Sequence, residues 1–97
     1  MTVYVDDAFI QATVPNGARS HTSQWCHLTA DSTEELVAFA RKLGLRPAWI
    51  QYPGTWKENF DVTQGKRAQA VRLGAVEVSS RERTVAMIRA WELKTLI

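Results

Sequence analysis

Cysteine is scarce in this sequence, and its scarcity excludes two kinds of stabilised small domain. Cys26 is the single cysteine among 97 residues, so neither an intrachain disulfide nor a multi-thiolate zinc site can form. With His21 and His27 nearby, a zinc site would still need a distant carboxylate as its fourth ligand. We therefore expect no metal and no cofactor, and a chain that suits a reducing compartment.

Long apolar runs and a basic leader are also absent. Residues 1–7 hold no Lys or Arg, and their apolar stretch is too short for a signal peptide or a membrane span. The sequence therefore predicts a cytoplasmic protein with no membrane partner. With 45% hydrophobic and 23% charged residues, the chain also falls outside the disordered and fibrous classes, and its length predicts one domain over residues 1–97.

The excess of positive charge is small, because the formal net charge is +2. Its distribution is uneven, since residues 1–61 hold five Lys or Arg against seven Asp or Glu, whereas residues 62–97 hold seven against three. A basic second part can attract an anionic partner. The chain lacks the long basic stripe of a duplex-DNA binder, which disfavours nucleic acid as that partner.

Strands and loops are predicted from period-two apolar spacing and from turn-forming residues. The spacing indicates strands near residues 2–5, 25–30, 49–51 and 75–78, with Trp25 and Trp49 in the interior. Polar and turn-forming residues predict a long loop over residues 8–24, with a hairpin at Asn16-Gly17 as the alternative, and a second loop over residues 52–60.

Three segments have the apolar spacing of helices. The first begins near Asp31, has a buried face that includes Leu36 and Phe39, and ends at Gly44. The second spans residues 63–73, and the third runs from the capping-box spacing of residues 79–82 to near Trp91. Residues 31–44 and 61–74 also resemble each other, and each segment follows the order Asp, helix, Leu-Gly. Because strand–helix–strand units favour parallel pairing, we predict a small α/β domain with a short, mostly parallel sheet of three to four strands and about three helices.

Carboxylates follow the predicted strands, where the ligand crevice of an open parallel sheet lies. Asp6 and Asp7 come after the first strand, and no helix signal follows them. Asp31 and Asp61 precede helices, so capping a helix is the more ordinary role for both, although a cap can still contact a ligand. Asp6 and Asp7 are therefore the stronger functional candidates, and Asp6 is the one placed in the ligand-binding set.

Strand alternation assigns different surroundings to Cys26 and His27. Trp25 and His27 share one face, and Cys26 and Leu28 share the other. Cys26 is then a core residue and cannot form a catalytic dyad with its neighbour. His27 is either a hydrogen-bonded strand histidine or a site acid or base.

Two cations begin the second predicted helix. Lys66 and Arg67 lie in its first turns, where the helix dipole disfavours positive charge, so a bound anion would relieve the cost. The phosphate-loop pattern is absent, and solvent-exposed cations are the alternative. We predict that Asp6, His27, Asp61 and Arg67 converge in one pocket.

A series of motifs resembles domain of unknown function 4031, a family met in bacteria, notably actinobacteria, and in their phages. The matching residues cover nearly the whole chain: Val5-Asp6, Arg19, Trp25-Cys26-His27-Leu28, Asp31, residues 34–40, Leu43-Gly44, Asn59-Phe60-Asp61-Val62, Lys66-Arg67 and Gly74-Ala75. The resemblance implies an α/β fold and adds Arg19 and Asn59 to the candidate site. It brings no assigned activity, and Asn59 and Val37 stand where the family has His.

Binding of a phosphate-bearing ligand, such as a nucleotide, at the carboxyl edge of the strands is the leading functional hypothesis. The candidate ligand-binding set is Asp6, Arg19, His27, Asp31, Asn59, Asp61, Lys66 and Arg67. An interaction module without catalytic activity is the alternative, docking on a host protein through Trp56, Tyr52 and the 8–24 loop. A metal-assisted phosphoesterase that uses the strand-end carboxylates is a third hypothesis.

Overall fold

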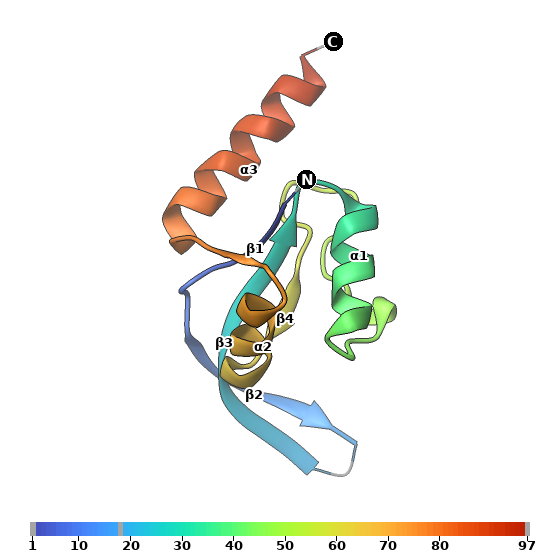
Figure 1. Ribbon diagram of the computed structural model, residues 1–97, viewed down its shortest axis with the longest axis vertical. Helices are drawn as coiled ribbons and strands as arrows, with labels where there is room; N and C mark the ends of the chain where they lie inside the picture. Colours follow the sequence, from blue (N-terminus) through green and yellow to red (C-terminus); the bar gives the residue numbers. More distant parts are fainter. Residues whose placement is uncertain (1, 18, 97) are drawn as a thin grey trace.

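A mixed sheet with helices on both faces forms the domain (Figure 1). The computed structural model describes residues 2–17 and 19–96, without the side chains of residues 14, 16, 19 and 21. Within this part, the sheet holds five strands: β1 (Val3–Val5), β2 (Ile10–Asn16), β3 (Arg19–Ala30), β4 (Phe60–Val62) and β5 (Val76–Glu77). The helices are α1 (Thr33–Lys42), α2 (Gln64–Arg72), α3 (Ser80–Thr95) and a short 3₁₀ turn, η1 (Pro47–Trp49).

The sheet is mostly antiparallel, so the prediction of a mostly parallel sheet is wrong. β3 pairs antiparallel with β1, β2 and β4, and β1 with β5 is the one parallel pair among the described strands. The reason is the connection after β1. A parallel neighbour needs a helical crossover, and this segment instead folds back directly as a hairpin.

Most of residues 8–24 form this hairpin, so the prediction of a loop is wrong and the alternative of a hairpin at Asn16-Gly17 is confirmed. β2 and β3 pair from Ile10 with Trp25 to Asn16 with Arg19, and Gly17 has a φ of +67°. Figure 1 shows the hairpin projecting from the body of the domain. Thr13 and Thr22, which are register partners on one face of the hairpin, are exposed, and Ala12 on the other face is half-buried. The polar and turn-forming residues around Asn16-Gly17 favour a loop over the short alternation of Ile10, Ala12 and Val14.

Residues 49–62 also differ from their prediction. The expected strand over residues 49–51 is η1 followed by a single bridge from Gln51 to Asn59, and Trp49 is 55% exposed rather than interior. The expected loop over residues 52–60 ends in β4, whose Phe60 and Val62 are buried. The turn pair Pro53-Gly54 places this segment in a loop on sequence grounds, although Phe60 and Val62 have the period-two spacing of a strand.

The hydrophobic core lies between the sheet and helices α1 and α2. Cys26 and Leu28 enter it from β3, as predicted, and Leu36 and Ala40 enter it from α1. The two repeated segments end their helices alike, because Gly44 and Gly74 both have positive φ and the next backbone N–H returns to the helix. The internal repeat therefore corresponds to two helices that pack on the same face.

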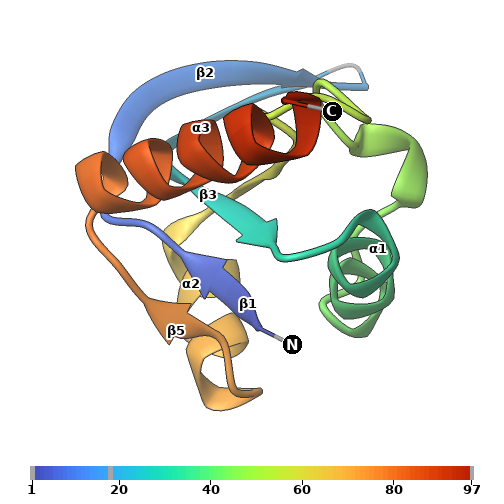
Figure 2. The same ribbon diagram turned by 90° about the horizontal axis from the view of Figure 1, so that it is seen from above.

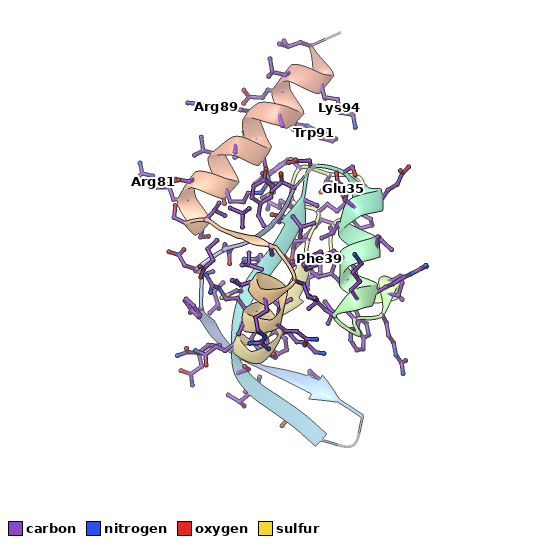
Figure 3. The ribbon with its side chains drawn as sticks, viewed as in Figure 1. Glu35, Phe39, Arg81, Arg89, Trp91 and Lys94 are labelled. Carbon is purple, nitrogen blue, oxygen red and sulfur yellow. The ribbon has the colours of Figure 1, made fainter. Side chains whose placement is uncertain are left out.

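The first part of α3 lies over the opposite face of the sheet, which carries Trp25, His27 and Thr29 of β3 (Figure 2). α3 extends beyond the sheet, and Arg81 and Arg89 project from it away from the rest of the domain (Figure 3). Arg83 points inward instead and donates hydrogen bonds to Thr29 Oγ1 and Ala30 O. No helix in the described part of the chain is long and apolar enough to cross a bilayer.

Replacing Leu36 tests the assignment of the core face. Leu36 is 1% exposed, and truncation to Ala leaves a cavity under α1, so Leu36→Ala should lower the free energy of unfolding by about 2–5 kcal/mol. Urea unfolding measures this change, with Glu34→Ala on the exposed side of the same helix as the control. Equal stability of the two variants would contradict the assignment.

Candidate functional site

A pocket lies on the polar face of the sheet, between β3, β4, the loop before β4 and the start of α3. Its volume is about 410 Å³, within the roughly 300–1,000 Å³ typical of small-molecule sites. The lining residues combine ionisable, amide, hydroxyl and aromatic groups: Asp6, Ile10, Ala12, Trp25, His27, Thr29, Gln51, Tyr52, Trp56, Lys57, Asn59, Asp61, Ser80, Arg83, Thr84 and Met87.

Asp6 holds His27 from behind. The Asp6 carboxylate is buried, and its Oδ2 lies 2.7 Å from His27 Nδ1. Asp6 Oδ1 accepts the backbone N–H of His27 at 2.8 Å and that of Ala8 at 3.3 Å. An ionised carboxylate can only accept, so Nδ1 carries a proton and Nε2 is the ring nitrogen that is left for a ligand.

The same contacts shift both pKa values. The hydrogen bond from Asp6 raises the pKa of His27, burial opposes it, and the charges of Asp6 and Asp61 add to the increase. Burial alone would raise the pKa of Asp6, but the hydrogen bonds from the His27 ring and backbone outweigh it and lower that pKa. Both shifts favour the ion pair, in which His27 and Asp6 are both charged.

Asp61 faces His27 across the β3–β4 pairing. The two residues are direct register partners, and His27 Nε2 lies 3.9 Å from Asp61 Oδ1, too far for a hydrogen bond. Gln51 Nε2 donates to the other oxygen, Asp61 Oδ2, at 2.8 Å. Both side chains are about one-third exposed. The space between His27 Nε2 and Asp61 Oδ1 therefore borders the pocket.

Asn59 lines the pocket two residues before Asp61. It is 7% exposed, and its Nδ2 donates to the backbone carbonyl of Lys57 at 2.6 Å. Its Oδ1 is buried and has no hydrogen-bond partner among the described residues. A buried carbonyl without a donor is costly and rare in folded proteins.

Cations and aromatic rings form the rest of the wall. The Lys57 ammonium lies 5.2 Å from the ring centre of Trp56 and 5.6 Å from that of Tyr52. The Arg83 guanidinium stacks on the Tyr4 ring at 3.9 Å. The Arg83 side chain is therefore held against the sheet by its hydrogen bonds to Thr29 and Ala30 and by the Tyr4 ring.

The predicted cations of α2 do not line this pocket. Arg67 donates to the backbone carbonyl of Asp6 at 2.7 Å and pairs with Glu77 at 3.0 Å, so it supports Asp6 without facing the pocket. Lys66 Nζ donates to the carbonyl of Leu43 at 2.5 Å, at the end of α1. Of the four residues predicted to converge in one pocket, Asp6, His27 and Asp61 line it. Arg67 contacts the backbone of Asp6 from outside the pocket.

The three other strand-end carboxylates have different places. Neither Asp31 nor Asp61 caps a helix, because Ser32 and Thr63 accept the first backbone N–H groups of α1 and α2. β3 runs opposite to β1, so Asp31 lies at the far end, where it accepts from Thr2 N and Tyr4 Oη. Asp7 accepts from Ser80 N at the start of α3, a contact across 73 residues that no local pattern reveals. The side chain of Arg19 lies outside the described residues.

Several pocket residues were not in the predicted set. Lys57 and Trp56 come from the 52–60 loop, Arg83 and Thr84 from α3, and Gln51 from a segment predicted as a strand. They reach the pocket because α3 folds back over the sheet and because β4 draws its preceding loop beside β3. The basic and aromatic composition of residues 56 and 57 was the one local signal available.

Comparison with known proteins identifies the family. Residues 3–90 match the family described as "Protein of unknown function (DUF4031)". The chain belongs to this family. The match covers most of the chain and confirms the resemblance found from its motifs. No curated protein and no solved structure gives a significant match.

Membership in this family assigns no chemistry, so the donor geometry has to do so. Asp6 and Asp61 lie on opposite sides of the His27 ring, one at each nitrogen, and therefore do not share a centre. No group of three His, Cys, Asp or Glu side chains among the described residues is arranged to hold a metal ion. Burial also raises the pKa of Cys26, which keeps its thiol protonated and unreactive. The site suits hydrogen bonding and proton transfer at His27 Nε2.

Stability should depend on pH through the Asp6–His27 pair. The pKa of His27 is raised from its ordinary 6.5, so its contribution is complete below pH 6.5 and is lost as pH rises through the raised value. The pKa of Asp6 is lowered from 3.8, so its contribution is complete above pH 3.8 and is lost as pH falls through the lowered value. Urea unfolding from pH 3 to 9 should show both limbs, and His27→Gln should lack the alkaline one. An unchanged alkaline limb in the variant would contradict the pairing.

We expect Lys66 to contribute to the stability of the fold and to have no part in anion binding. Its ammonium lies against the carbonyl end of α1, where positive charge is favourable, and Lys66→Glu replaces it by a repelled carboxylate. We expect a loss of about 1 kcal/mol in unfolding free energy and no change in sulfate or phosphate binding. Lys42→Glu, one residue before the α1 C-cap, is the matched control for charge alone. Weaker anion binding by Lys66→Glu at unchanged stability would contradict this and support an anion site at the start of α2.

Proposed function

We propose that the pocket binds a small ligand that carries both a phosphate group and a planar ring, of the nucleotide type. The observation that supports this most strongly is the position of His27: Asp6 fixes the ring through Nδ1, and Nε2 faces a pocket of suitable volume. A histidine held in this way is ready to donate from Nε2 to a ligand oxygen at little cost in side-chain entropy.

The charge of the pocket favours an anion. With His27 protonated, its lining carries three positive groups, His27, Lys57 and Arg83, against the carboxylates of Asp6 and Asp61. Asp6 is occupied by His27 and by two backbone N–H groups. The remaining field toward the pocket is therefore positive beside Lys57 and Arg83, and negative only beside Asp61.

The aromatic residues account for the planar part of the ligand. Trp25, Trp56 and Tyr52 line the pocket together, and each offers a flat face or edge on which a heteroaromatic ring can stack. The proposal keeps the phosphate-bearing ligand expected from the sequence but moves its anionic group from the start of α2 to the polar face of the sheet. A cytoplasmic location, where such ligands are abundant, is part of it.

Docking of a host or phage protein is a second candidate, supported by exposure at the mouth of the pocket. Tyr52 is 58% exposed and Ile10 is 52% exposed, and both line the pocket. Exposed aromatic and aliphatic side chains of this kind can anchor a protein partner. Such a partner would contact these side chains without needing the protonated state of His27.

Titration calorimetry with adenosine 5′-monophosphate and with inorganic phosphate tests the proposal. Binding of the nucleotide should weaken by about tenfold in Lys57→Gln and in His27→Gln, since each loses a charge-assisted contact worth about 1.5–3 kcal/mol. Binding should also weaken as pH rises through the raised pKa of His27.

Lys42→Gln is the matched control for Lys57→Gln, because Lys42 is an exposed lysine at the end of α1, outside the pocket. Thermal melts of each variant separate lost binding from lost folding. Failure of the nucleotide and of phosphate to bind at millimolar concentration would contradict the proposal and favour the docking candidate.

A further inference from the structure

Two residues that line the pocket each have an acceptor oxygen for which the described residues supply no hydrogen bond. Asp61 Oδ1 lies 3.9 Å from His27 Nε2, and Asn59 Oδ1 is buried without a partner. We propose that these two acceptors bind the hydroxyl groups of a ribose, so that the pocket prefers ribonucleotides to their deoxy forms. This inference rests on the proposed function and names the sugar of its ligand.

The gap between His27 and Asp61 suits a hydroxyl group. A separation of 3.9 Å is too long for a direct hydrogen bond and fits a single oxygen placed beside both atoms. A hydroxyl can accept from Nε2–H and donate to the carboxylate at the same time, whereas an ammonium can only donate and a phosphate oxygen can only accept. The pair therefore selects a group with both capacities.

Asn59 requires a donor, and its orientation is fixed. Its Nδ2 donates to the carbonyl of Lys57 at 2.6 Å, and turning the amide over would place two carbonyl oxygens against each other. Oδ1 is consequently the atom left without a partner in a side chain that is more than nine-tenths buried. A hydroxyl entering from the pocket would satisfy it.

The strand places the two acceptors on the same face of the sheet. Asn59 and Asp61 are two residues apart along the β4 edge, so both face the pocket with backbone positions roughly 6.6 Å apart. Neighbouring hydroxyls can then lie between them, one donating to each. A donor with a positive charge is disfavoured, because Lys57 and Arg83 line the same pocket.

Calorimetric titration with four probes tests this inference: adenosine 5′-monophosphate, its 2′-deoxy and 3′-deoxy forms, and ribose 5-phosphate. Each deoxy form should bind the wild-type protein at least about tenfold more weakly than the parent nucleotide. Asp61→Asn should lose most of the preference for one hydroxyl, and Asn59→Ala that for the other. Glu34→Gln, which removes a carboxylate outside the pocket, should keep both preferences.

The outcomes separate the two proposals. Equal affinity for all three nucleotides would overturn the ribose inference and leave the proposed function standing, whereas the absence of binding by all four probes would overturn both. A retained preference in Asp61→Asn and Asn59→Ala, with normal melts, would also overturn it. Ribose 5-phosphate that binds as well as adenosine 5′-monophosphate, with both deoxynucleotides weaker, would support the hydroxyl contacts and identify a pentose phosphate as their source.

Discussion

The buried carboxylate of Asp6 is the constraint on which the site depends. A carboxylate that is 4% exposed must be compensated, and three N–H groups from His27 and Ala8 do so, while Arg67 binds the backbone carbonyl of the same residue. These contacts join β1, β3 and α2 at one point. Because the same contacts orient the His27 ring, the group that stabilises the junction of three elements also determines which nitrogen faces the pocket.

One strand serves both the core and the site. Alternation along β3 puts Cys26 and Leu28 into the core under α1 and α2, and puts Trp25 and His27 on the opposite face. The site therefore lies on a strand whose other face is packed in the core, and this packing limits movement of the His27 backbone in addition to the contacts with Asp6. α3 covers the site face only in part, since Arg83 and Thr84 reach the pocket while the far end of the helix extends beyond the sheet (Figure 1).

Local patterns predicted the features that depend on neighbours in the chain. The three helices, the ends at Gly44 and Gly74, and the two faces of β3 follow from spacing within about ten residues. The strand directions could not be predicted, because polar and turn-forming residues between Pro15 and Gln24 favour a loop where the hairpin of β2 and β3 lies. The site shows the same division: Asp6 and His27 were identifiable at the end and middle of strands, whereas Arg83 reaches the pocket only through the packing of a distant helix.

Strand direction also explains why only one of two repeated aspartates lies at the pocket. Asp31 and Asp61 hold equivalent positions in the repeated segments, so on sequence grounds they should share a role. β3 and β4 are antiparallel, however, and Asp31 follows the end of β3 whereas Asp61 lies within β4. Asp31 is carried to the start of β1, and Asp61 comes to face His27. Equivalent residues in a repeat acquire equivalent surroundings only when their strands have the same direction, and the antiparallel pairing removes that equivalence here.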